Sequence, residues 1–102
     1  MLDIKITGPD SSPNIVCNGK IDEAGAEKMK HCFFELNVKA LQAVTFDFKE
    51  VSYVGSACIG KLLLFYKEIG DAGGTMKIIN INESVLELFK VVRLDTILDI
   101  ST

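Results

Sequence analysis

The chain has 102 residues, of which 48% are hydrophobic and 25% charged, and its formal net charge is −3. This length predicts one domain, residues 1–102, built around a single core, and the composition is typical of globular proteins. The charged residues form no basic patch for nucleic-acid binding. The longest apolar stretch, around residues 62–66, is far too short to span a bilayer.

Two features bear on the cellular compartment. Residues 1–5 lack the basic region and the long apolar run of a signal peptide. The three cysteines, Cys17, Cys32 and Cys58, cannot all pair, and they form no Cys-x-x-Cys motif. We therefore expect a cytoplasmic protein with reduced thiols.

The first part of the chain predicts a hairpin followed by a helix. Apolar and polar residues alternate over residues 2–7, a turn occupies residues 8–13, and a second strand covers residues 14–21. Asp22 is placed to cap the next helix. One face of this helix carries apolar residues at helical spacing, namely Met29, Cys32, Phe33 and Leu36.

The second part predicts strands separated by helices. A strand at residues 43–48 leads through a loop to a helix at about residues 56–71, and a strand at residues 75–81 follows. Ser84 to Glu87 has the pattern of a capping box, which predicts that a third helix begins at Ser84. Its apolar stripe comprises Val85, Leu88, Phe89 and Val92. The apolar tail at residues 94–100 is left unassigned.

The element order, ββαβαβα, predicts an α/β fold. Right-handed crossovers would give a small, mostly parallel sheet of four to five strands, with the helices packed mainly on one face. In the helix at residues 56–71 we expect the core stripe to be Ile59, Leu62, Leu63 and Tyr66, with Leu64 and Phe65 outside it. So wide an apolar arc predicts either deep burial or a patch for a partner.

Ser56 stands where a strand and loop deliver the chain into this very apolar helix. Its hydroxyl would lie at the positive end of the helix dipole, beside unpaired backbone N–H groups that can hold an anion. A serine at such a place commonly acts as the N-cap, and from the residues alone that interpretation is favoured. The same place also suits a serine that carries a phosphate, and the two roles are compatible.

Three motifs, in order and at matching spacing, resemble the STAS domain family. They are the run Gly19 to Asp22, the strand residue Asp47, and the run from Val51 to Gly60, Val-Ser-Tyr-Val-Gly-Ser-Ala-Cys-Ile-Gly. The likeness covers nearly the whole chain and implies the STAS fold. Ser56 matches the phosphoacceptor position of the family's anti-sigma factor antagonists.

The resemblance implies a binding protein that acts by partner switching. Its partners would be an anti-sigma factor serine kinase and a PP2C-type phosphatase, and the domain itself would be a monomer or weak dimer with no cofactor. The partner-binding surface would comprise Asp22, Gly55, Ser56, Ala57, Cys58 and Lys61. The alternative, from another class, is an unphosphorylated STAS subunit that docks on a lipid-transport ABC ATPase or serves as a scaffold in a signalling assembly.

The sequence departs from the family pattern at three positions. Gly55 replaces the aspartate before the acceptor serine, Ala57 replaces a second hydroxyl residue, and Cys58 replaces a glycine. The loss of the aspartate removes a carboxylate beside the acceptor, which predicts a different kinase preference. The loss of the second hydroxyl leaves Ser56 as the only acceptor in this loop.

Catalytic and metal-binding interpretations find little support. His31 is the only histidine and has no His or Cys at ligand spacing, so we expect no metal site. A nucleophile elbow around Ser56 would need glycines where Val54 and Cys58 stand, and there is no Walker A loop. We therefore expect no enzymatic activity. Cys58 is either a reactive thiol at a helix start or, as favoured here, a packed core residue.

Overall fold

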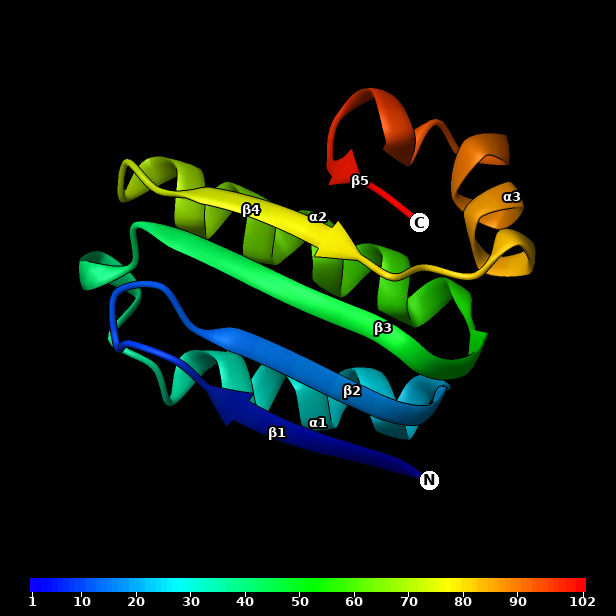
Figure 1. Cartoon of the computed structure of the whole chain (residues 1–102), viewed down its shortest axis with the longest axis horizontal. Helices are drawn as coiled ribbons and strands as arrows, with labels where there is room; N and C mark the ends of the chain where they lie inside the picture. The colour runs from blue at the N-terminus through cyan, green and yellow to red at the C-terminus, as the bar shows by residue number, and fades with distance from the viewer.

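Five strands form one sheet in the order β1-β2-β3-β4-β5, as the computed structural model shows for all 102 residues (Figure 1). The strands β1 and β2 are antiparallel, and the other three pairs are parallel. The strands are β1 (Leu2–Thr7), β2 (Asn14–Ile21), β3 (Ala43–Val54), β4 (Thr75–Ile79) and β5 (Asp99–Ile100). The helices are α1 (Glu23–Phe34), α2 (Ser56–Asp71) and α3 (Glu83–Val91), with 3₁₀ turns at Val38–Ala40 and Leu94–Thr96. The predicted α/β fold is confirmed.

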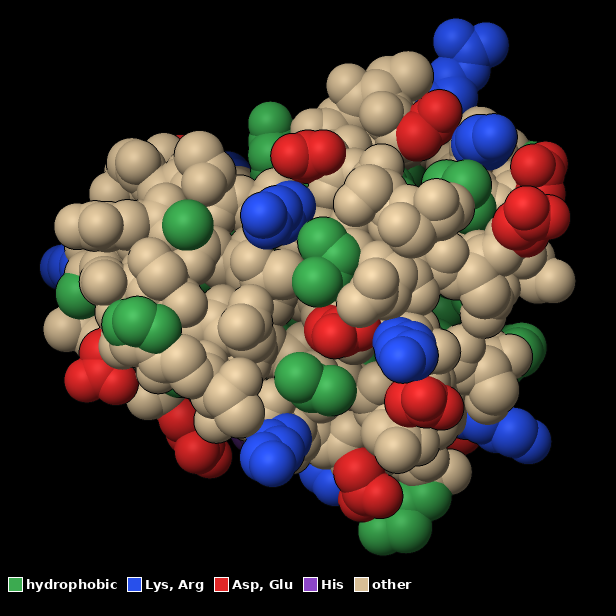
Figure 2. Space-filling view, in the orientation of Figure 1, with side chains coloured by type: hydrophobic (Ala, Val, Ile, Leu, Met, Phe, Trp, Pro, Cys, Tyr) green, Lys and Arg blue, Asp and Glu red, His purple; other side chains and the backbone are tan.

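The helices α1 and α2 cover one face of the sheet, and α3 lies beyond the carboxyl end of β4 (Figure 1). The core between these layers centres on stacked aromatic rings. The ring of Phe65 lies 4.4 Å from Phe33 of α1 and 5.8 Å from Phe46 of β3, measured between centroids. The opposite face of the sheet is uncovered and carries acidic and basic side chains side by side (Figure 2). None of the helices has the length and apolar character needed to cross a bilayer.

The strand β3 is twice as long as predicted, since it continues through residues 49–54. Val16 of β2 pairs with Asp47, but Asn18 pairs with Glu50, so β3 contains an extra residue opposite Cys17. This bulge shifts the alternation and allows both Phe48 and Val51 to face the core. The polar pair after Phe48 looks like a strand end in the sequence, and for this reason the prediction stopped too early.

Asp47 holds the bulge and the turn after β4 together. Its Oδ1 accepts a hydrogen bond from the Lys49 backbone N–H at 3.0 Å and another from the Asn80 side-chain amide at 3.1 Å. Asn80 has a φ of +58°, so the chain leaves β4 there, two residues earlier than predicted. The carboxylate of Asp47 therefore links the bulge inside β3 to the end of β4.

The third helix begins earlier than predicted. Asn82 is its N-cap, because its Oδ1 accepts a hydrogen bond from the Val85 backbone N–H at 2.9 Å, whereas Ser84 lies inside the first turn. The predicted capping box at Ser84 is therefore wrong. Of the predicted stripe, Val85 and Phe89 are buried and Leu88 is half-buried, whereas Val92, at the end of the helix, is 45% exposed. The tail after α3 forms a 3₁₀ turn and the short β5, which pairs with β4.

The core stripe of α2 differs from the predicted one. The buried residues are Cys58, Leu62, Phe65 and Ile69, while Leu63 and Tyr66 are 37% and 42% exposed. Of the predicted stripe only Leu62 is fully buried, and Phe65, predicted to lie outside it, is the centre of the aromatic stack. The stacking of Phe65 between Phe33 and Phe46 sets the rotation of the helix.

Candidate functional site

The junction between β3 and α2 is tied to the end of β2. The backbone N–H of Gly55 donates a hydrogen bond to the carbonyl oxygen of Ile21 at 2.9 Å. Gly55 is the N-cap of α2, with an extended backbone at φ −96°, and Ser56 is the first helical residue. The interpretation of Ser56 as the N-cap is therefore wrong, and its hydroxyl is not used in capping.

The first turn of α2 offers unpaired donors beside an exposed serine. The Cys58 N–H bonds to the Gly55 carbonyl at 3.1 Å, whereas the N–H groups of Ser56 and Ala57 have no acceptor. Ser56 is exposed to solvent. Together with the positive end of the helix dipole, these N–H groups tolerate negative charge on the Ser56 hydroxyl.

A shallow groove separates the amino-terminal turns of α1 and α2. Its lining residues are Glu23, Glu27, Ser56, Ala57, Gly60, Lys61 and Leu64. Lys61 bridges the groove, since its ammonium group lies 3.0 Å from the Glu27 carboxylate. The hydrogen bond and the charge of Lys61 lower the pKa of Glu27 below its usual range. The groove therefore holds two acidic side chains and one lysine that is already paired.

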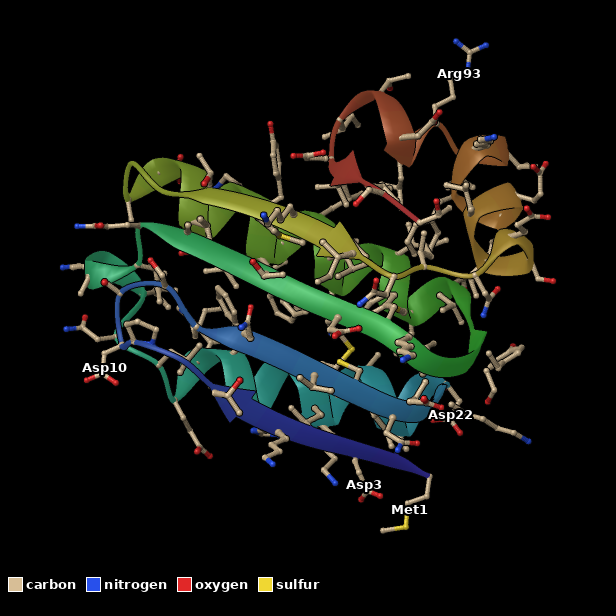
Figure 3. All side chains as sticks on the ribbon, viewed as in Figure 1. Met1, Asp3, Asp10, Asp22 and Arg93 are labelled. Carbon is tan, nitrogen blue, oxygen red and sulfur yellow. The ribbon has the colours of Figure 1, made fainter.

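Asp22 lies on the same edge of the molecule. Its Oδ1 accepts a hydrogen bond from the Gly25 backbone N–H at 2.8 Å, so it is the predicted N-cap of α1. Figure 3 shows Asp22 at the turn between β2 and α1. Because the preceding residue, Ile21, bonds Gly55, the N-termini of α1 and α2 are neighbours.

Cys58 has to be removed from the predicted partner-binding surface. Its side chain is fully buried beneath α2, together with Cys17 of β2. Burial, and to a lesser extent the charge that Cys17 would carry, raises the pKa of the Cys58 thiol. Burial likewise raises the pKa of Cys17 to about 12. Cys58 is thus a core residue, and its thiol stays protonated at neutral pH.

An exposed strip runs from Ser56 along α2 and was missed in the sequence because the core stripe was placed on the wrong face. We call Ser56, Ile59, Gly60, Leu63 and Tyr66 the outer strip. Their spacing is that of one helical face. Leu63 and Tyr66 are exposed, and Ile59 is half-buried. The outer strip is therefore an apolar surface continuous with the acceptor serine.

Three other residues near the site were not predicted to belong to it, namely Tyr53, Glu23 and Glu27. Tyr53 is 51% exposed, and its hydroxyl lies 3.4 Å from the place that a Gly55 Cβ would occupy. Glu23 and Glu27 reach the groove only because α1 packs beside α2. His31 is exposed on α1, outside this groove, and no three His, Cys, Asp or Glu side chains gather in a metal-binding arrangement.

Comparison with known proteins connects this arrangement to one family. The model of the STAS domain matches residues 4–102. The anti-sigma-B factor antagonist of Bacillus subtilis (strain 168) is 29% identical over 100 residues, which cover 98% of this chain and 89% of that protein.

Two solved structures share the fold. An anti-sigma factor antagonist from Mycobacterium paratuberculosis matches 99% of this chain and 86% of its own, with a TM-score of 0.87 and 16% identity. The Bacillus cell fate determinant SpoIIAA in its phosphorylated form matches 98% and 92%, with a TM-score of 0.70 and 17% identity. At these identities the two structures establish similarity of fold, and the family match covers almost the entire sequence. The chain belongs to the STAS domain family.

Proposed function

We propose that this domain is an anti-sigma factor antagonist whose partner binding is controlled by phosphorylation of Ser56. The observation that carries the proposal is the exposed Ser56 hydroxyl, free of any capping role, at the start of α2. The relative from Bacillus subtilis is an anti-sigma-B factor antagonist, and SpoIIAA has a phosphorylated form. The first supports the antagonist role and the second supports control by phosphorylation, while the choice of Ser56 rests on its exposure and its place at the start of α2.

The unphosphorylated domain binds an anti-sigma factor kinase through the outer strip and the groove beside it. Leu63 and Tyr66 supply exposed apolar area. Gly60 has no side chain, so the kinase can pack directly against the helix backbone there. The edge of the site is formed by Asp22 and Gly55. Binding of the kinase releases the sigma factor, and a PP2C-type phosphatase restores the unphosphorylated domain.

A phosphate on Ser56 adds about −1.5 to −2 charges at neutral pH. The groove has no free positive charge to balance the phosphate, since Glu23 and Glu27 are acidic and Lys61 is already paired with Glu27. In the free domain, water and the first-turn N–H groups solvate the phosphate, so the fold survives. In a docked complex the same charge would be buried without a partner, which costs several kcal/mol. The kinase therefore dissociates.

The test has two parts. The protein is incubated with its cognate kinase and ATP, and fragment mass spectra should place one phosphate on Ser56 and none on the exposed Ser52 or Ser84. Calorimetry should then show that Ser56→Asp binds the kinase at least tenfold more weakly than Ser56→Ala, since one uncompensated charge already accounts for such a factor. Phosphate found only on Ser52 or Ser84, or equal binding by the two variants, would contradict the proposal. As a control, both variants should unfold at the same temperature as the parent, which shows that the substitutions leave the fold intact.

A further inference from the structure

The outer edge of β1 is unpaired and carries a self-complementary charge pattern. The strand β1 is the last strand on its side of the sheet and pairs only with β2 (Figure 1). Figure 1 shows no other strand or helix along the outer edge of β1, and one side chain of α1, Lys28, reaches this edge at the Leu2 carbonyl. A six-residue strand with a free edge is a template for pairing with another chain.

The backbone groups that face outward can be identified from two hydrogen bonds. The Met1 carbonyl accepts from the Lys20 backbone N–H at 3.4 Å, so Met1 is turned toward β2. The register from Leu2–Gly19 to Thr7–Asn14 has no shift, so the direction alternates along the strand. The backbone groups of Leu2, Ile4 and Ile6 therefore point outward. In agreement, the Leu2 carbonyl accepts from the side chain of Lys28 at 2.7 Å instead of from β2.

We propose that β1 pairs antiparallel with β1 of a second copy of this chain, in the register centred on Ile4. In this register Ile4 faces Ile4 of the second copy, Leu2 faces Ile6, and Asp3 faces Lys5. The hydrogen-bonding pairs use the outward groups of the three apolar residues. The two-fold axis at Ile4 makes both Asp3–Lys5 contacts identical, as a closed dimer requires.

The charges select this register over its neighbours. A shift by one pair in one direction places Asp3 opposite Asp3, and a shift in the other direction places Lys5 opposite Lys5. Like charges directly opposite are destabilising in an antiparallel pair, whereas opposite charges stabilise it. The register centred on Ile4 pairs all residues from Leu2 to Ile6. Asp3 and Lys5 are both exposed, and Figure 3 shows Asp3 near the free end of β1.

Apolar contact supports the same pairing. On the helix side of the sheet, Ile6 is 40% exposed, and in the dimer it faces the buried Leu2 of the second copy. The pairing joins the two five-stranded sheets into one continuous sheet, with the helices of both copies on the same face. The dimer leaves α2 and Ser56 free, so it goes beyond the proposed partner switching and does not depend on it.

The dimer is weak. One short strand pair buries much less than the ~800 Å² per partner that stable complexes bury. In addition, the Leu2 carbonyl already accepts a hydrogen bond from the Lys28 ammonium group. In the dimer it would have to accept a second one, from the Ile6 N–H of the second copy. Self-association is therefore expected only at high protein concentration.

Sedimentation equilibrium over a micromolar to millimolar range tests the proposal with charge exchanges. Asp3→Lys and Lys5→Asp each convert two attractive contacts into two repulsive ones, and each should raise the dissociation constant about tenfold or more. The double variant Asp3→Lys/Lys5→Asp restores opposite charges and should recover association close to that of the parent. The control is Asp10→Lys, which makes the same charge change in the exposed turn between β1 and β2 and should have no effect.

Amide NMR shifts measured against concentration locate the contact. The N–H signals of Leu2, Ile4 and Ile6 should move in the parent and the double variant and stay constant in the single variants. A parent that is monomeric at millimolar concentration would overturn the proposal, since the edge would then be free for another chain or protected by Lys28. A double variant that associates no better than the single ones would also overturn it, and so would shifts confined to the outer strip of α2.

Discussion

The side-chain amide of Asn82 donates a hydrogen bond to the carbonyl oxygen of Val51 at 3.0 Å, so the cap of α3 is fixed to the second half of β3. The same side chain accepts from the Val85 N–H at 2.9 Å. One residue therefore starts a helix and connects it to a strand that lies 31 positions earlier in the chain. The orientation of α3 at the end of the sheet depends on this double contact.

We predict that Asn82→Ala lowers the free energy of unfolding by ~2 kcal/mol, because it removes a helix cap and leaves the Val51 carbonyl without its donor. Urea denaturation measures the change. The matched control is Ser84→Ala, two residues along, which should lie within ~0.5 kcal/mol of the parent because Ser84 makes no capping contact. A larger loss in Ser84→Ala than in Asn82→Ala would restore the capping box predicted from the sequence.

The start of α3 illustrates what the sequence could and could not specify. Both Asn82 and Ser84 satisfy the local rules for a helix start, and Ser84 also has Glu87 three residues on. The decision is made by the Val51 carbonyl, a contact distant in sequence. In contrast, Asp22 was correctly predicted as a cap because its donor, the Gly25 N–H, lies three residues away. Strand and helix order followed from similarly local patterns.

In the candidate site, too, local features were predictable from the sequence and contacts between distant residues were not. The position of Ser56 at the start of α2 was predictable from the strand, the loop and the apolar helix. The rotation of α2 was not, because its many apolar residues fit more than one stripe and only contact with Phe33 and Phe46 selects Phe65 for the core. The Glu27–Lys61 pair was not predictable either, since it depends on how α1 packs against α2.

The buried thiols give a prediction at alkaline pH. Burial raises the pKa of Cys17 from 9.0 to about 12 and also raises the pKa of Cys58. The folded state therefore keeps these protons where the unfolded chain loses them. The stability from the two neutral thiols is complete below about pH 9 and is lost as the pH rises toward 12. Urea denaturation at several alkaline pH values should show this decline.

The double variant Cys17→Ala/Cys58→Ala tests the source of the decline, since its stability should fall less steeply with pH. Alkylation of the native parent at neutral pH gives an independent measurement. The half-buried Cys32 should react, whereas Cys17 and Cys58 should react only after unfolding. Rapid labelling of native Cys58 would contradict its placement in the core.

Gly60 offers a test of the outer strip. No atom lies within 4 Å of the place that its Cβ would occupy, so Gly60→Ala fits the free domain and should stabilise it by up to ~1 kcal/mol through helix propensity. If the kinase seats closely on this backbone, the added methyl group should weaken binding severalfold. Gly70→Ala is the matched control in the same helix, since its Cβ position is equally open and it does not line the groove. If both variants bind the kinase equally well, Gly60 does not contact the kinase.

The last prediction concerns Gly55, where the family pattern has an aspartate. Its φ of −96° suits any residue, and the atoms nearest to a Cβ there, in the Tyr53 ring and hydroxyl and the Ile21 carbonyl, would lie at 3.4 to 3.6 Å. Gly55→Asp should therefore fold. As N-cap, its carboxylate can accept from the first-turn N–H groups and lies near the positive end of the dipole, so stability should rise by ~0.5 kcal/mol.

The added carboxylate should also change phosphorylation of Ser56, because it stands beside the acceptor hydroxyl and either orients it or repels the incoming phosphate. Gly55→Asn is the matched control, since it caps α2 with nearly the same shape and no charge. Thermal unfolding and the rate of Ser56 phosphorylation by the cognate kinase are measured for both variants and the parent. A rate changed in Gly55→Asp and unchanged in Gly55→Asn assigns the effect to charge. If neither the rate nor the stability of Gly55→Asp differs from the parent, the absent carboxylate has no part in kinase preference.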